Sequence, residues 1–578
     1  MTGAIGKQRS YVGGSFIAVG VLLAAPAGAA SNPTLKIGIV QRFGEQPKDT
    51  LTIQALPGDR LTLKFADQGQ VKTLATNKVQ FDIQPQPLPK PVIQERVVLG
   101  VFRSFESAET QALDYRMQGI PVEVAQPNKW QVWAKRDRYS TPKKRKKLVK
   151  TLKEQGKSVF LDQQRQVQKP LLSWVVDGYR YSRDSVSITS GKSVLQVQKN
   201  RYGGTLKFQP NTYGSYTLVN QVPIETYLRG VVPYEIGFSA PLTSIQAQAI
   251  IARTYALRNL RRFKIDDYEL CADTQCQVYR GLSGAKSRVD DAIATTAGQV
   301  LTYDNELIDA LYSSTTGGVT ASFEEVWEGD PRPYLQTKID AAPNPVWDLK
   351  TRSLADPANF KAFVNLKQGF NEVTWPTFRW RIEAPLAEMN QILRKFLRQK
   401  QHPLAEFGTI QTLEITKRSH GGRVQTLRVT TDIGSVELHK DEIVQGIRGA
   451  KSLLFYVEPM YEPQPPIVNA PDPQSPAPPP EKVLKGYRFV GGGWGHAVGL
   501  SQTGAQHLSK LGWSASKILD FYYPGTTLEP LTDTIARWRE PEIPAPSPAA
   551  PEEQNGGFLG LKLPQIDWQG FWEWLPFT

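Results

Sequence analysis

An acidic residue ends an apolar run in the segment Gly230-Val-Val-Pro-Tyr-Glu235. A carboxyl group buried beside apolar side chains stays neutral at higher pH than usual, and can then act as a general acid. A loop glutamate, or one that stabilises the dipole at the N-terminus of a helix, would give the same local pattern. This segment alone therefore leaves a catalytic and a structural interpretation of Glu235 open.

Further motifs that combine glycine with polar side chains follow Glu235 along the chain. In order, they are Gln246–Arg258, Cys271–Tyr279, Asp309–Gly318, Gly493–Ala505 and Tyr522–Gly525. Together with Tyr227–Glu235, they resemble the SpoIID/LytB family (sporulation stage II protein D / amidase enhancer) of bacterial cell-wall proteins. The resemblance covers residues 202–530. It implies a lytic transglycosylase that cleaves peptidoglycan glycan strands, with Glu235 as the catalytic acid/base. A non-catalytic enhancer of an N-acetylmuramoyl-L-alanine amidase is the alternative.

A lytic transglycosylase needs only one such carboxyl group. The acid protonates the oxygen between MurNAc and GlcNAc and then, as a base, helps the muramyl C6 hydroxyl attack C1, which leaves a 1,6-anhydro end. A pair of carboxylates, as in ordinary glycosidases, is not required. This chemistry fits a chain in which Glu235 alone stands out, beside Val231, Val232 and Ile236.

The motifs also predict which residues contact the glycan. Trp494 can stack on a sugar ring, and His496 can hydrogen-bond it. Arg253 and Tyr255 are expected to orient Glu235 or bind sugar hydroxyls, with a structural salt bridge and a core phenol as alternatives. The full predicted set is Gln248, Arg253, Tyr255, Tyr312, Ser313, Ser314, Thr316, Trp494, His496, Ser501 and Gln502. Ala497 departs from the family, in which glycine is common at this position.

The chain has only two cysteines, Cys271 and Cys276. A pair of cysteines in an exported protein favours a disulfide that closes a short loop. Zinc is the alternative, but two thiolates without a neighbouring histidine supply only half of a tetrahedral site. The sequence therefore predicts a disulfide, no metal site and no cofactor.

The first 30 residues predict export. Lys7 and Arg9 precede the apolar stretch Phe16–Ala25, and Ala27-Gly-Ala29 is typical of a cleavage site, with an uncleaved anchor as the alternative. The formal net charge of the 578-residue chain is +14. In the periplasm or cell envelope, this charge would meet anionic wall polymers and not nucleic acid.

We expect a multidomain α+β chain. Val97–Phe160 predicts the order βαββαβ, with helices over Ser107–Gln118 and Lys143–Gly156, and resembles a SPOR-type peptidoglycan-binding module. A generic α+β domain without a ligand is the alternative. The aromatic C-terminal tail is expected to dock on the fold or to contact a membrane surface. The expected divisions are a signal peptide (1–30), a small β-rich module (31–84), the SPOR-like module (95–165), a SpoIID-like catalytic domain (173–530) with a proline-rich excursion (463–482), and a proline-rich linker with the tail (541–578).

Overall fold

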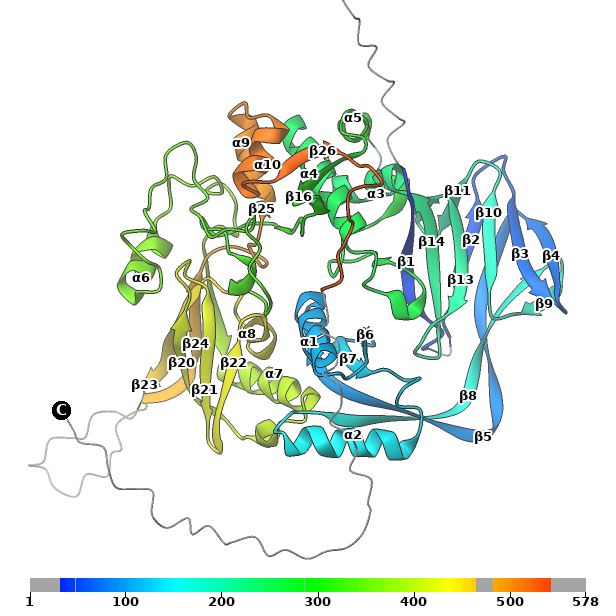
Figure 1. Cartoon of the computed structure of the whole chain (residues 1–578), viewed down its shortest axis with the longest axis horizontal. Coiled ribbons are helices and arrows are strands. Elements are labelled where there is room, and N and C mark those ends of the chain that lie inside the picture. Colours follow the sequence, from blue (N-terminus) through cyan, green and yellow to red (C-terminus); the bar gives the residue numbers. More distant parts are fainter. Residues whose placement is uncertain (1–31, 47, 285, 464–481, 542–578) are drawn as a thin grey trace, which may run out of the picture.

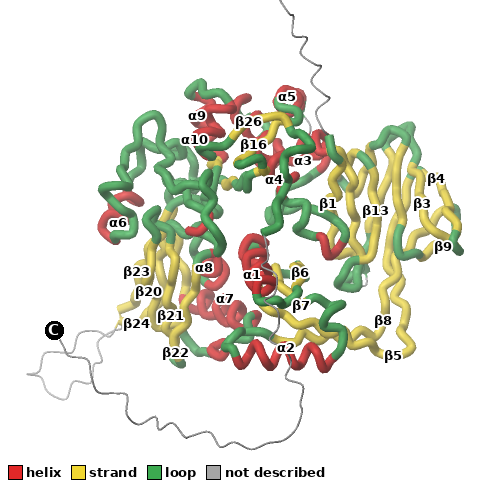
Figure 2. The backbone as a smooth tube through the Cα atoms, viewed as in Figure 1, coloured by secondary structure: helices red, strands yellow, loops and turns green. Residues whose placement is uncertain are grey.

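The computed structural model describes residues 32–46, 48–284, 286–463 and 482–541. The expected signal peptide, nearly all of the proline-rich excursion and the aromatic tail lie outside these ranges. Within them the chain is mixed α+β with several sheets, which confirms the predicted fold class (Figures 1 and 2). No helix among these residues is both long enough and apolar enough to cross a lipid bilayer.

The N-terminal strands share a sheet with strands more than 100 residues further along the chain. Its seven strands run in the order β15 (Leu270–Cys271), β1 (Thr34–Phe43), β14 (Tyr216–Pro223), β13 (Thr205–Pro210), β10 (Val186–Ser190), β3 (Leu61–Asp67) and β4 (Gln70–Thr76). Apolar side chains alternate along β3 and β10, so both strands bury one face in a common core. Residues 31–84 were expected to form a separate module. Their strands β1, β3 and β4 instead belong to the sheet that leads into the SpoIID-like motifs.

The second sheet is built around one long strand, β5 (Lys78–Phe102). Its main path is β12 (Asn200–Gly203), β11 (Val194–Val197), β2 (Leu51–Ala55), β5, β7 (Trp130–Ala134) and β6 (Val122–Ala125), while β8 (Phe160–Val176) pairs with β5 and β9 (Tyr179–Ser182). A proline-rich stretch, residues 85–91, lies inside β5. Proline is tolerated there because β5 pairs only with β8 along this stretch, so a missing N–H breaks no second ladder.

Residues 97–160 adopt the predicted βαββαβ order. Helix α1 (Phe105–Met117) begins after the cap Ser104, and α2 (Pro142–Glu154) begins after the cap Thr141. Both caps accept a backbone N–H bond through a hydroxyl, as serine and threonine favour at helix starts. In Figure 1, α1 lies near the centre of the molecule, between the two β-rich sides.

Helix α4 (Leu242–Arg258) is the buried centre of the helical part. Most of its residues are buried, and many of them are small or apolar, which lets it pack against α3, α5, α9, α10 and β16. The elements around it are α3 (Ile224–Ile236), α5 (Ser287–Thr295), α9 (Gln502–Lys510), α10 (Ala515–Tyr522) and the sheet β17 (Glu306–Leu307), β16 (Gln299–Tyr303), β26 (Thr527–Pro530).

The third part lies between the two halves of the helical part in sequence. Strand β24 (Lys482–Gly491) follows the proline-rich segment and pairs with both β23 (Phe455–Pro463) and β19 (Trp380–Pro385). The chain therefore leaves and re-enters one sheet around the segment, as expected of an excursion. The remaining elements are β20 (Ile410–Arg418), β21 (Val424–Thr431), β22 (Gly434–His439), α6 (Pro357–Asn365), α7 (Leu386–Gln399), α8 (Asp441–Gly446) and the pair β18 (Tyr312–Ser313) and β25 (Leu500–Ser501).

Candidate functional site

A cleft of about 790 Å³ opens where the βαββαβ module, the helical part around α4 and the third part, which contains α8, meet. The start of α1, the end of α3, the cysteine loop, β18 and the glycine-rich loop at 494–496 all contribute to its wall. Its lining includes Arg103, Ser104, Glu106, Tyr234, Glu235, Tyr255, Gln275, Tyr312, Ser313, Ser314, Trp327, Asp441, Lys451, Trp494, His496 and Gln502. Seven of the predicted contact residues and Glu235 thus line a single cavity, although their motifs lie far apart in sequence.

Glu235 occupies the last turn of α3 and is half-buried. Its Oε1 accepts the backbone N–H of Val278 across 2.7 Å, and its Oε2 accepts the side-chain amide of Gln502 across 3.4 Å. Burial raises the pKa of Glu235, while hydrogen bonds from Val278, Gln502 and Tyr312 partly oppose this rise. The carboxyl group therefore reaches the cleft in an environment that favours its neutral form.

A short chain of hydrogen bonds leads to the Glu235 carboxyl group through Tyr312. The Tyr227 hydroxyl donates to Oε1 of Gln277 across 3.1 Å, and Nε2 of Gln277 donates to the Tyr312 hydroxyl across 3.1 Å. Gln502 also donates to Oε1 of Gln248 across 3.4 Å. Gln248 is fully buried and does not line the cleft, so it acts on Gln502 and has no access to a glycan.

The glycine-rich loop presents one exposed aromatic ring to the cleft. Trp494 keeps 54% of its surface exposed, and Nζ of Lys451 lies 5.4 Å from its ring centre. The ring of His496 packs 5.1 Å from that of Trp327, and its Nδ1 accepts the backbone N–H of Val498. Burial lowers the pKa of His496 to about 4, so this imidazole is neutral and its Nε2 can donate a hydrogen bond.

Ala497 adopts the left-handed backbone conformation, with φ of 64°. An L-residue with a Cβ atom disfavours this region, and glycine accepts it without strain. The loop therefore keeps the turn in spite of the departure from the usual glycine.

Besides Gln248, three further predicted contact residues do not reach the cleft. Arg253 is fully buried and makes a two-pronged ion pair with Glu225, at 2.7 Å for each bond, so it does not orient Glu235. Thr316 and Ser501 are also fully buried, and both donate their hydroxyls to Oε1 of Glu372. Their roles are structural, since the predicted hydroxyl contacts point into the protein core.

Glu372 organises the turn at the Thr-Thr-Gly-Gly motif. Its carboxylate accepts the backbone N–H groups of Thr316 (2.5 Å), Gly317 (2.8 Å) and Gly318 (3.1 Å). A Cβ atom on Gly317 would lie 2.6 Å from the carbonyl carbon of Gly492, so the glycine permits close contact between two loops. Gly317 of this motif therefore admits the neighbouring backbone.

The remaining predicted residues lie at the cleft. The ring of Tyr255 packs 6.4 Å from that of Tyr312, while the Arg262 guanidinium lies 5.2 Å from the Tyr255 ring. The Ser313 hydroxyl is buried without a partner among the described residues, and Ser314 is half-buried. Both serines therefore remain candidates for ligand contact.

Sequence reasoning missed several residues of the site. Gln277 and Val278 lie in the cysteine motif, and their proximity to Glu235 arises from the fold. Glu372 and Asp340 belong to stretches without a periodic pattern. Arg103 precedes α1 in a segment that the sequence assigned to another module, and Lys451 lies in an irregular loop.

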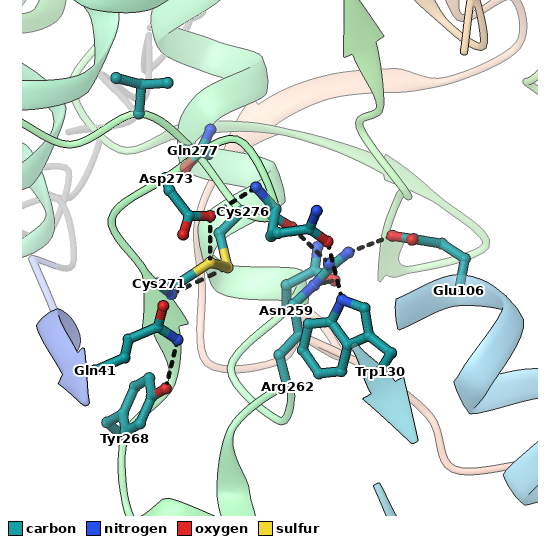
Figure 3. The surroundings of a disulfide bond; sticks show 12 residues. Gln41, Glu106, Trp130, Asn259, Arg262, Tyr268, Cys271, Asp273, Cys276 and Gln277 are labelled. Carbon is teal, nitrogen blue, oxygen red and sulfur yellow. Dashed lines mark hydrogen bonds and ion pairs between the residues drawn. A yellow bond between two sulfur atoms is a disulfide. The ribbon is translucent and has the colours of Figure 1, made fainter. Parts of the chain in front are cut away.

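Cys271 and Cys276 form a disulfide with their Cα atoms 5.6 Å apart. Figure 3 shows Trp130 and Glu106 of the βαββαβ module beside the enclosed loop. Nε1 of Trp130 donates to Oε1 of Gln275 in this loop across 3.0 Å. Arg262 donates to the Gln275 carbonyl and pairs with Glu106 of α1. The loop therefore joins α1 to the segment that holds Glu235.

Known proteins resemble this chain in two regions. Residues 212–303 match a protein-family model described as "Stage II sporulation protein", and residues 321–499 match a domain of unknown function, DUF8618. The "Amidase enhancer" of Bacillus subtilis (strain 168) is 28% identical over 61% of this chain and 50% of that protein. The "Stage II sporulation protein D" of the same organism is 30% identical over 30% of this chain. The protein of that name from Bacillus amyloliquefaciens is 24% identical over 58% of this chain and 83% of its own length.

The chain spans about half the length of the two Bacillus subtilis relatives, 50% and 55%. The matched region 212–303 contains Glu235 and both cysteines, while Trp494 and His496 lie in or at the edge of the second matched region. The ordered motifs and these matches support a SpoIID/LytB family assignment for this chain.

Proposed function

We propose that this protein remodels peptidoglycan in the cell envelope, as a lytic transglycosylase that cleaves MurNAc–GlcNAc bonds with Glu235 as acid/base. The observation that carries this proposal is the environment of Glu235. It is a carboxyl group whose pKa is raised by burial, and it lies at a cleft that also presents the exposed ring of Trp494.

The residues of the cleft have clear roles in such a reaction. The neutral Glu235 protonates the glycosidic oxygen, so that the bond from C1 to this oxygen breaks and GlcNAc leaves with a hydroxyl group. The resulting carboxylate then accepts the proton of the muramyl C6 hydroxyl, whose oxygen forms the new bond to C1. Gln502 and the N–H of Val278 hold the carboxyl group in place and stabilise its transient charge. Trp494 provides a stacking surface for a sugar ring. No metal or cofactor is required for this chemistry.

A non-catalytic function is the second candidate. The similarity to a protein named "Amidase enhancer" favours it. In this case the cleft would bind glycan strands and deliver them to a separate amidase, with Glu235 as a hydrogen-bonding group.

Mass analysis of the products from purified glycan strands tests these candidates. The wild-type protein is expected to release 1,6-anhydromuramyl ends, and Glu235→Gln is expected to lower the rate by about three orders of magnitude or more. Glu269→Gln is the matched control, because burial also raises the pKa of this carboxyl group outside the cleft. Reducing ends alone would identify a hydrolase. Stimulation of an amidase without glycan cleavage would establish the enhancer.

A further inference from the structure

The carboxyl groups that line the cleft have hydrogen-bonding or ionic partners or are held toward the neutral form, whereas two of its cations form no ion pair within the part of the chain that the structure describes. Its three carboxyl groups are all accommodated: Glu106 pairs with Arg262, Glu235 is held toward its neutral form, and Asp441 accepts the hydroxyls of Ser104 (2.8 Å) and Ser107 (3.4 Å). Burial also raises the pKa of Asp441 to about 6.

The two cations of the lining are different. Among the described residues, no carboxylate lies within 4.0 Å of Arg103 or Lys451. Burial lowers the pKa of Arg103 and the nearby Asp441 partly opposes this, but the two side chains form no ion pair. The cleft therefore offers two cationic groups that its own acids do not neutralise.

The backbone at Arg103 is fixed by the helix that follows it. Arg103 directly precedes the cap Ser104 of α1, and α1 is tied to the helical part by two ion pairs, Glu106 with Arg262 and Glu109 with Arg261. The hydroxyl of Thr110 adds a bond to the carbonyl of Glu328 across 2.9 Å. The βαββαβ module thus contributes a fixed wall of the cleft.

Lys451 is held beside the exposed ring of the opposite loop. Its carbonyl accepts the N–H of Gly495 across 3.2 Å, and its ammonium lies 5.4 Å from the ring centre of Trp494. A sugar stacked on Trp494 would therefore place its substituents next to a positive charge.

We propose that Arg103 and Lys451 form a carboxylate-binding subsite, which recognises an acidic substituent of the sugar chain bound in this cleft. The proposal rests on the proposed function, since it takes a glycan strand as the ligand. Arginine supplies several N–H donors in a fixed plane, and lysine supplies a mobile ammonium, so together they suit a carboxylate on a flexible substituent. The carboxylate can be the free lactyl group of a muramyl residue or can belong to an attached peptide.

Binding measured by titration calorimetry tests the subsite without turnover. The full chain with Glu235→Gln is titrated with a GlcNAc–MurNAc tetrasaccharide that carries free lactyl carboxylates, with the same tetrasaccharide after conversion to methylamides, and with chitotetraose. We expect the acid to bind about tenfold more tightly than the methylamide, as for a hydrogen bond to a charged group. Chitotetraose should bind as weakly as the methylamide. A peptide-bearing tetrasaccharide distinguishes the two sources of the carboxylate, because only the second source would give it the tighter binding.

Arg103→Gln and Lys451→Gln should each reduce the preference for the acid, and the double variant should abolish it. Lys510→Gln, an exposed lysine outside the cleft lining, should retain it. Equal affinity of the Glu235→Gln protein for all probes would overturn the subsite, as would a preference that survives in the double variant. The outcome is separate from that of the proposed function: binding preference without 1,6-anhydro products supports the subsite and contradicts the transglycosylase, and cleavage without preference does the reverse.

Discussion

The side-chain amide of Gln502 lies 3.4 Å from Oε2 of Glu235, although the two residues are 267 positions apart in sequence. Gln502 is the first residue of α9, and Glu235 lies in the last turn of α3. The start of α9 is fixed in turn by Ser501, which caps the helix and donates its hydroxyl to Glu372. The geometry of the acid therefore depends on a buried carboxylate that does not reach the cleft.

Replacing Gln502 by leucine should shift the pH profile of glycan cleavage. The hydrogen bond from Gln502 favours the ionised form of Glu235, so its loss raises the pKa of Glu235 further. If Glu235 must be protonated to react, the alkaline limb of the kcat profile moves to higher pH. Loss of orientation should also lower kcat by about tenfold to a hundredfold.

Gln506→Leu is the control for this variant. Gln506 lies on the same helix and donates to the carbonyl of Ile236 across 2.9 Å, next to Glu235 but not to its carboxyl group. It should leave the alkaline limb in place. An unshifted limb in Gln502→Leu would remove Gln502 from the positioning of the acid.

The Glu235→Gln variant should also show a pH-dependent gain in stability. The pKa of Glu235 is higher in the folded protein than its ordinary value of 4.5, so the ionised form destabilises the fold. The wild type therefore loses stability relative to the variant as the pH rises above 4.5, and the two are equal below it. Melting temperatures measured between pH 4 and about pH 8 provide the test.

Asp309→Asn should show the opposite dependence. Arg258 and Arg332 lie beside Asp309 and lower its pKa to about 2, against an ordinary value of 3.8. This carboxylate stabilises the fold above pH 3.8, and its contribution disappears as the pH falls toward 2. Asp309→Asn should thus be destabilised at neutral pH. A stability difference of the same sign for both variants at neutral pH would contradict the assignment of Glu235.

Local patterns in the sequence were sufficient for the two helices of the βαββαβ module and for seven of the eleven predicted contact residues. The helix starts at Ser104 and Thr141 follow from their capping hydroxyls, and Trp494 is exposed in a glycine-rich loop as expected. Local patterns could not show that Arg253 lies outside the site. An arginine on a helix near a glutamate gives the same pattern whether its side chain lines a cleft or forms a buried ion pair. Its partner Glu225 lies 28 residues earlier in the sequence, where no local pattern links the two.

Long-range pairing was the other limit. Strand β3 alternates like an independent hairpin strand, and nothing in residues 61–67 indicates that its neighbour is β10. The sequence could not show that the prolines at 85–91 lie inside a strand, because their effect depends on whether a third strand needs the missing N–H groups. Glu372 has no local signature, since its importance comes from the backbone N–H groups that surround it.

Glu372 should be far less replaceable than its buried neighbour Asp340. Both carboxylate oxygens of Glu372 accept backbone N–H groups, so glutamine must direct an amide N–H₂ against a donor. Burial and the proximity of Glu372 raise the pKa of Asp340 well above its ordinary value, which makes asparagine a close substitute for its neutral form. We expect Glu372→Gln to lower the free energy of unfolding by about 2 kcal/mol or more, and Asp340→Asn by about 1 kcal/mol. Thermal unfolding compares the two, and equal losses would refute this assignment.

The disulfide should support both the fold and the acid. It closes a loop between residues five positions apart, for which the loop-entropy estimate is about 2 kcal/mol. Gln277 and Val278 follow this loop directly and contact Tyr312 and Glu235. Replacing both cysteines by serine should therefore lower the melting temperature. It should also reduce kcat at temperatures at which the variant is still folded. The wild-type protein should show no free thiols before reduction, and two reactive thiols or stoichiometric zinc would contradict the disulfide. A double variant that melts earlier but retains full kcat would confine the disulfide to stability, because the N–H of Val278 would then reach Glu235 without it.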